Sequence, residues 1–148
     1  ILLKDFYKGY KQLNKNKDEY LECIEFKLPS KNAHFNFEKV SKRTHLDIAS
    51  VNSAMCIETD NDIISSIHIS AGGVAPIPLY LENTSKFLLG KKITGDTLFE
   101  SLPIIQSEIS PITDIRGSAD YKRLLLNQLF KAHFIELFHE LISVEALI

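Results

Sequence analysis

Three cations lie within five positions in the first third of the chain, Lys39, Lys42 and Arg43, and Asp47 follows them. Lysine and arginine donate hydrogen bonds to anionic oxygens. In an extended strand Lys39 and Arg43 share one face because they are four residues apart, whereas Lys42 points away. Taken alone, the same run is typical of a solvated turn. The first question is therefore whether these cations face an anionic ligand.

Other residue types that carry chemistry have no supporting pattern. The histidines and cysteines lack HxxxH and CxxC spacing, so no metal site is predicted. No GxSxG motif marks a nucleophile, and no catalytic residue is predicted. Gly72-Gly73 lacks the context of a phosphate-binding loop, so the interpretation is a tight turn with positive φ at Gly73. The residues in question are His34, His45, His68, His133, His139, Cys23 and Cys56.

Composition sets broad limits. The 148 residues form one domain by size, and 45% hydrophobic with 24% charged residues is typical of a soluble globular protein. A net charge of −2 argues against nucleic acid or an anionic membrane as a partner. The two cysteines are expected to be free, buried thiols in a reducing cytoplasm. The chain begins with Ile1 and has no signal-peptide pattern, which suggests a fragment.

The first half of the chain reads as strands. Ile24, Phe26 and Leu28 alternate with charged residues from Cys23 onward, which predicts a half-buried strand that ends at Pro29. Further strands are predicted over His34–Val40, Ile48–Glu58 and Ile63–Ser70. The turn formers TDND join the last two as a hairpin. In the last strand, the face with Ile63, Ser65, Ile67 and Ile69 is expected to meet the core.

The second half reads as helices. Asn83 or Thr84 is expected to cap a helix that ends at Gly90, and Thr94 one that runs to about Ile105. The longest helix is predicted from Ser118 to about Leu141, with a buried stripe of Tyr121, Leu125, Leu129 and Ala132. Strands followed by helices predict an α+β fold: an antiparallel sheet of three to four strands with about three helices packed on one face.

Four separated motifs also agree with one family. KVSKRTHLDIASV resembles a KxxxRxxxDIAxV element, SAGGVAPIPLYL a GGVAPxP segment, FLLGKKIT an LxGK turn, and DIRGSADYKRLLLNQL a helix start. Their order and spacing are similar to those in the FAD-binding (medium) subunit of the xanthine dehydrogenase and carbon monoxide dehydrogenase family, the molybdenum hydroxylases. The likeness runs from Lys39 to about Leu129.

The resemblance implies that residues 20–148 are the C-terminal domain of this flavoprotein subunit and residues 1–19 the tail of the preceding FAD-binding domain and a linker. Family enzymes oxidise substrates at a molybdopterin centre and pass electrons through two [2Fe–2S] clusters to FAD, and then to NAD or another acceptor. Molybdopterin and the clusters are implied on partner subunits or segments. The preceding domain holds most of the FAD, so the isolated chain is expected to bind FAD weakly or not at all and to be inactive.

By motif position, Lys39 is the implied flavin contact, and Cys23 and Ile24 are implied to add a packing or backbone contact. Arg43 matches a family position as well, but pairing with Asp47 is an equal alternative to ligand contact. A second hypothesis belongs to a different class: an assembly or interaction domain without enzymatic function, which kept the fold and no longer binds flavin.

Overall fold

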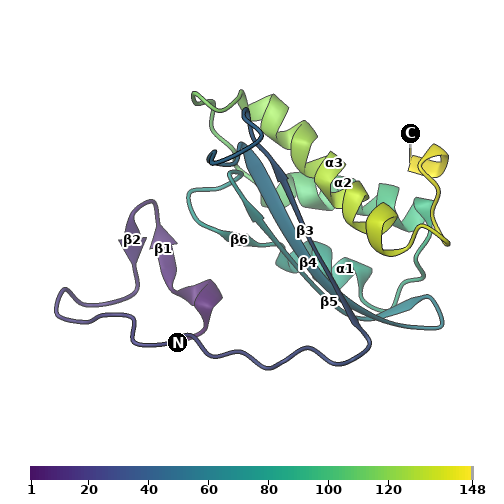
Figure 1. The fold of residues 1–148 in the computed structure, drawn as a ribbon, viewed down its shortest axis with the longest axis horizontal. Helices are drawn as coiled ribbons and strands as arrows, with labels where there is room; N and C mark the ends of the chain where they lie inside the picture. The colour runs from purple at the N-terminus through teal and green to yellow at the C-terminus, as the bar shows by residue number, and fades with distance from the viewer. Residues whose placement is uncertain (148) are drawn as a thin grey trace.

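Two long antiparallel strands form the centre of the main sheet (Figure 1). In the computed structural model, which describes residues 1–147, these strands are β4 (Val51–Asp60) and β5 (Ile63–Gly72). Asn61 and Asp62 join them with φ of 48° and 64°, the left-handed backbone that a two-residue hairpin turn requires. β3 (Ala33–Val40) and β6 (Leu79–Tyr80) flank them in the order β3-β4-β5-β6. The predicted hairpin and the strand before it are confirmed.

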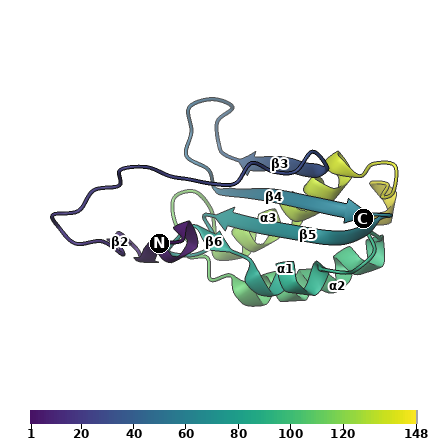
Figure 2. The same ribbon diagram turned by 90° about the horizontal axis from the view of Figure 1, so that it is seen from below.

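All three α-helices cover one face of this sheet, and the other face is open (Figure 2). They are α1 (Glu82–Leu88), α2 (Gly95–Glu108) and α3 (Ala119–Leu137). α3 packs on β3 and β4, and α1 packs on β5 and α2. The predicted α+β fold, with an antiparallel sheet and helices on one face, is therefore confirmed.

The helix starts follow local capping rules in two of three cases. Thr94 accepts a hydrogen bond from the Thr97 N–H at 3.2 Å, as predicted. Ser118, where the longest helix was predicted to begin, accepts one from the Tyr121 N–H at 3.1 Å. The predicted cap of α1 is wrong, because Asn83 and Thr84 lie inside the helix. Their N–H groups donate instead to the carboxylate of Glu108 on α2, at 2.7 and 2.8 Å. α2 extends past the predicted end to Glu108, and α3 ends before Leu141.

The core lies between the sheet and the helices, and a β-bulge sets which residues of β5 enter it. Glu58 pairs with Ser66 and Thr59 with Ile64, so Ser65 is an extra residue in β5. Ile64 therefore joins Ile67 in the core, whereas Ile63 is 45% exposed. The predicted alternation from Ile63 is wrong at its beginning because the sequence does not reveal the bulge.

The buried stripe of α3 is rotated by about one residue from the predicted stripe. Tyr121 is 42% exposed and Leu125 is half-buried. Lys122, a charged residue outside the predicted stripe, is buried. The buried residues are Lys122, Leu126, Leu129, Phe130, His133 and Phe134.

The predicted strand over Cys23–Leu28 is wrong. The segment is irregular, and Ile24, Phe26 and Leu28 are 58%, 79% and 86% exposed. A strand needs a partner for its backbone, and within residues 1–147 no strand pairs with this segment. Cys23 is an exposed free thiol rather than a buried one, and the free thiol of Cys56 is half-buried.

Short elements lie at both ends of the chain. At the N-terminus, η1 (Leu3–Asp5) precedes a small hairpin of β1 (Tyr7–Gly9) and β2 (Gln12–Leu13), drawn in purple in Figure 1. At the C-terminus, η2 (Glu145–Leu147) contacts α2. Among residues 1–147, no helix has the length and apolar character needed to cross a membrane.

Candidate functional site

Two of the three cations, Lys42 and Arg43, follow β3 in a loop that we call the basic turn, residues 41–49. β3 ends at Val40, so Arg43 is not on an extended strand and the predicted shared face with Lys39 is wrong. Asp47 closes the loop: its carboxylate accepts from the Arg43 N–H at 2.9 Å and from the Arg43 guanidinium at 3.3 Å. These bonds, the backbone one first, hold the pKa of Asp47 below its usual value. The ionised Asp47 thus fixes the shape of the turn.

Lys39 is exposed on β3, next to this turn. It pairs across the strands with Asn52, and strand alternation directs its side chain to the open face of the sheet. Its ammonium donates to the Asp47 carbonyl at 2.6 Å. An ammonium has three donor hydrogens, and this bond is its one hydrogen bond to the described residues. Two donors of Lys39 therefore remain for solvent or a ligand.

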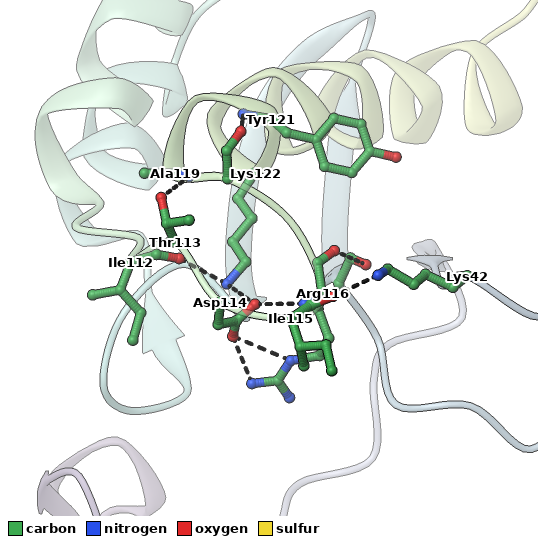
Figure 3. A network of polar contacts seen from close by, with 11 residues as sticks. Lys42, Ile112, Thr113, Asp114, Ile115, Arg116, Ala119, Tyr121 and Lys122 are labelled. Atoms are coloured by element: carbon green, nitrogen blue, oxygen red, sulfur yellow. Dashed lines mark hydrogen bonds and ion pairs between the residues drawn. The ribbon is translucent and has the colours of Figure 1, made fainter.

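A second loop, the aspartate turn (residues 112–117), lies just before α3 and holds an ion-pair network around Asp114 (Figure 3). Arg116 contacts one carboxylate oxygen through its guanidinium at 2.8 Å, and Lys122 contacts the other at 2.9 Å. Lys122 also donates to the Ile112 carbonyl at 2.9 Å. The Arg116 guanidinium and then the Lys122 ammonium hold the pKa of Asp114 well below its usual range.

Two hydrogen bonds join the aspartate turn to the region of the basic turn. The Lys42 ammonium donates to the Ile115 carbonyl at 2.5 Å, and the Ser50 hydroxyl donates to the Arg116 carbonyl at 2.8 Å. Between the two loops lies a hollow of about 410 Å³. Its lining combines three cations with apolar side chains, which suits a ligand with a flat apolar body and hydrogen-bond acceptors at its edge. The lining residues are Lys42, Arg43, Asp47, Ile48, Ile115 and Arg116.

The structure brings together only part of the predicted site. Lys39 and Arg43 meet at Asp47, but of the four predicted residues only Arg43 lines the hollow. Lys39 lies outside its lining, and Cys23 and Ile24 lie in the exposed irregular segment. Lys122 was not predicted to be part of the site, because a lysine at the start of a helix gives no sign of burial in the sequence. Within residues 1–147, no group of three or more His, Cys, Asp or Glu side chains is arranged to hold a metal ion.

The sequence of this domain matches a flavoprotein family. Residues 36–137 match the model of a protein family that is described as "CO dehydrogenase flavoprotein C-terminal domain". The chain belongs to this family, and the resemblance read from its motifs is confirmed.

Curated proteins of similar sequence include one named as an FAD-subunit and one named as a medium chain. The chain is 25% identical to the nicotinate dehydrogenase FAD-subunit of Eubacterium barkeri, over 94% of this chain and 48% of that protein. It is 30% identical to the glyceraldehyde dehydrogenase medium chain of Sulfolobus acidocaldarius, over 89% of this chain and 46% of that protein. Similarity to xanthine dehydrogenase 1 of Arabidopsis thaliana, at 28% identity, covers 94% of this chain and 11% of that protein. The chain thus spans about half the length of the subunit relatives.

Solved structures show the same fold. A Cu,Mo-CO dehydrogenase matches with a TM-score of 0.82 at 22% identity, over 87% of this chain and 45% of that chain. Quinoline 2-oxidoreductase from Pseudomonas putida 86 matches with a TM-score of 0.79 at 22% identity, over 98% of this chain and 48% of that chain.

Proposed function

We propose that this chain works as the C-terminal domain of the FAD-binding subunit of a molybdenum-flavin oxidoreductase and covers one side of the flavin. The observation that carries the proposal is Lys39, an exposed ammonium on the open sheet face, fixed next to the basic turn by the Asp47 carbonyl. In the proposed enzyme, electrons from a molybdopterin centre pass through [2Fe–2S] clusters on partner subunits or segments to FAD. NAD or another acceptor then receives them.

The residues present fit a flavin edge. When bound, FAD supplies a ring that accepts electrons and gains negative charge on reduction. Lys39 would donate to that ring and stabilise the charge, and Arg43 would add a second cation while it stays paired with Asp47 at 3.3 Å. Ile48 and Ile115 would provide the apolar contact.

The exposed segment before β3 supports a proposed place for the preceding domain. In the described chain no residue before Ser50 is buried, and Ile24 is 58% exposed. Exposed apolar side chains that gather in one segment commonly mark an interaction site. We assign residues 1–19 to the preceding FAD-binding domain and its linker, and we place Cys23 and Ile24 against that domain as packing or backbone contacts. On this arrangement the isolated chain binds FAD weakly or not at all and is inactive.

The complex is proposed to be cytoplasmic, and the free thiols of Cys23 and Cys56 support that location. Its partners would be the molybdopterin-binding and iron–sulfur subunits, with no nucleic acid and no membrane surface among them.

The test uses the subunit that includes the natural upstream half. The wild-type protein should show an FAD absorption spectrum, and Lys39→Ala should weaken FAD binding at least about tenfold, because a hydrogen bond from a charged donor contributes about 1.5–3 kcal/mol. Lys39→Arg should restore part of the affinity. Lys92→Ala is the matched control, since Lys92 is exposed and bridges Ile63 at the opposite end of the sheet.

An assembly domain without flavin is the alternative outcome. A wild-type subunit that binds no FAD, although it is folded and joins its partners, would favour it. Glycine-rich phosphate-binding loops in the upstream sequence would argue against it. If FAD binds but Lys39→Ala leaves affinity, spectrum and acceptor reduction unchanged, the role assigned to Lys39 is wrong.

A further inference from the structure

Lys122 is a buried charge in the mostly apolar stripe of α3. Its side chain is 2% exposed, and it lies in the first turn of the helix. A buried ammonium is costly unless it is paired and hydrogen-bonded, and Lys122 meets this condition with the Asp114 carboxylate and the Ile112 carbonyl, both at 2.9 Å. Both partners belong to the aspartate turn. The side chain therefore ties this turn to α3.

From Asp114, a continuous series of contacts reaches the proposed flavin contact. The Asp114 carboxylate accepts from the Arg116 N–H at 2.8 Å, which orients the two peptide groups that follow. The Ile115 and Arg116 carbonyls then accept from Lys42 and Ser50, at 2.5 and 2.8 Å. Lys42 lies within the basic turn, and Ser50 immediately follows it.

The basic turn in turn presents Lys39, because the Asp47 carbonyl accepts from its ammonium at 2.6 Å. The hydrogen bonds of Arg43 and Asp47 stay within this loop, and a backbone bond from Ser50 to Val40 closes its base. The Lys42 bond to the Ile115 carbonyl connects the loop to the aspartate turn, so the orientation of the basic turn depends in part on that turn.

We propose that Lys122, through Asp114, is a positioning residue that holds the basic turn and Lys39 in place for the flavin. This inference rests on the proposed function and identifies residues that position the side chains of the same site. Loss of a residue that orients a binding group commonly changes affinity or activity, although that residue does not touch the ligand.

Arg123 provides a matched control on the same helix. Its guanidinium donates to the Gln106 and Ile109 carbonyls at 2.9 and 3.2 Å, so it joins α3 to the end of α2. No hydrogen bond or ion pair runs from Arg123 to the aspartate turn among the described residues. Lys122→Met and Arg123→Met each remove one cation that joins α3 to a neighbouring segment, but only Lys122 is connected to the basic turn.

The experiment measures thermal stability, FAD affinity and flavin reduction potential in the full subunit. Both variants should lower the melting temperature. Lys122→Met should weaken FAD binding on the order of tenfold and shift the potential in the direction seen for Lys39→Ala, by analogy with the loss of outer-shell partners. Arg123→Met should leave the FAD affinity within about twofold of wild type, the range expected for independent sites, and the flavin potential unchanged. Lys122→Arg should recover part of the affinity.

A double variant makes the test specific. If Lys122 acts through Lys39, adding Lys122→Met to Lys39→Ala should weaken FAD binding by no more than about a further twofold. Full additivity overturns the inference, and so does equal behaviour of Lys122→Met and Arg123→Met. If Lys122→Met does not fold, Ser50→Ala decides: it removes only the bond to the Arg116 carbonyl, and unchanged FAD binding overturns the inference.

Failure of the proposed function has a different signature. Wild-type protein without FAD, or Lys39→Ala without effect, overturns both statements together. Weaker FAD binding in Lys39→Ala alone, with Lys122→Met equal to Arg123→Met, overturns only the positioning role.

Discussion

The stability of the chain should fall between pH 6.5 and pH 4 because of a single buried histidine. His133 is fully buried where α3 packs on β3. Its Nδ1 lies 3.1 Å from the Asn36 side-chain nitrogen, which also donates to the Glu38 carboxylate at 2.8 Å. This assigns Nδ1 as an acceptor and leaves the ring proton on Nε2, which has no hydrogen-bond partner among the described residues. Protonation of Nδ1 would place two donors against each other.

Burial lowers the pKa of His133 from 6.5 to about 4, and the Glu38 carboxylate opposes part of this shift. Since the folded pKa is below the unfolded pKa, the unfolded chain binds more protons between these values. Stability is therefore fully present above pH 6.5 and is lost as the pH falls toward 4. At about 1.4 kcal/mol per pH unit, the loss is about 3 kcal/mol.

The assay is urea unfolding followed by circular dichroism at a series of pH values from 4.5 to 7.5. His133→Leu should remove most of the slope, because leucine fills similar space and does not titrate. His139→Gln, which alters an exposed histidine just beyond α3, should keep the slope. The lowered carboxyl pKa values of Asp47 and Asp114 act mainly below about pH 4, so they leave this window clear. A wild-type stability that is flat across the window, or a slope that persists in His133→Leu, would refute the reasoning.

Two further substitutions test local features of the fold. Gly73→Ala should lower the free energy of unfolding by about 1–3 kcal/mol, because φ is +84° and a Cβ would lie 2.3 Å from the Ser50 carbonyl oxygen; Gly90→Ala, with φ of +79° but open space around it, should cost less in the same urea titration. Glu108→Ala should speed hydrogen exchange in α1 and destabilise the chain by about 1–2 kcal/mol, because its carboxylate caps the Thr84 N–H at 2.8 Å, and unchanged exchange at Thr84 would contradict this role.

Features set by neighbouring residues were predictable from the sequence. Thr94 and Ser118 cap helices through bonds to groups three residues away, and the hairpin turn at Asn61 needs only its own backbone. The positive φ of Gly73 was predicted for the same reason and is confirmed.

Features that need a distant partner were not predictable. The alternation around Ile24 is a valid strand pattern, but a strand forms only where another strand accepts its backbone. The bulge at Ser65 depends on the register between β4 and β5, which residue types along one strand do not encode. The helix cap supplied by Glu108 lies 24 residues from Thr84 and is invisible to local rules.

The candidate site also contains both kinds of feature, those set by neighbouring residues and those that need a distant partner. The basic turn was recognisable because Lys39, Arg43 and Asp47 are close in sequence and form hydrogen bonds with one another. Its support was not, since Lys42 meets the Ile115 carbonyl across 73 positions of the chain. A lysine in the first turn of a helix is normally solvated, and only the carboxylate of Asp114, folded back against it, makes burial of Lys122 favourable. The pattern of charges along the chain therefore indicates which side chains could contact a ligand. The residues that hold those side chains in position become apparent only once the fold brings the two loops together.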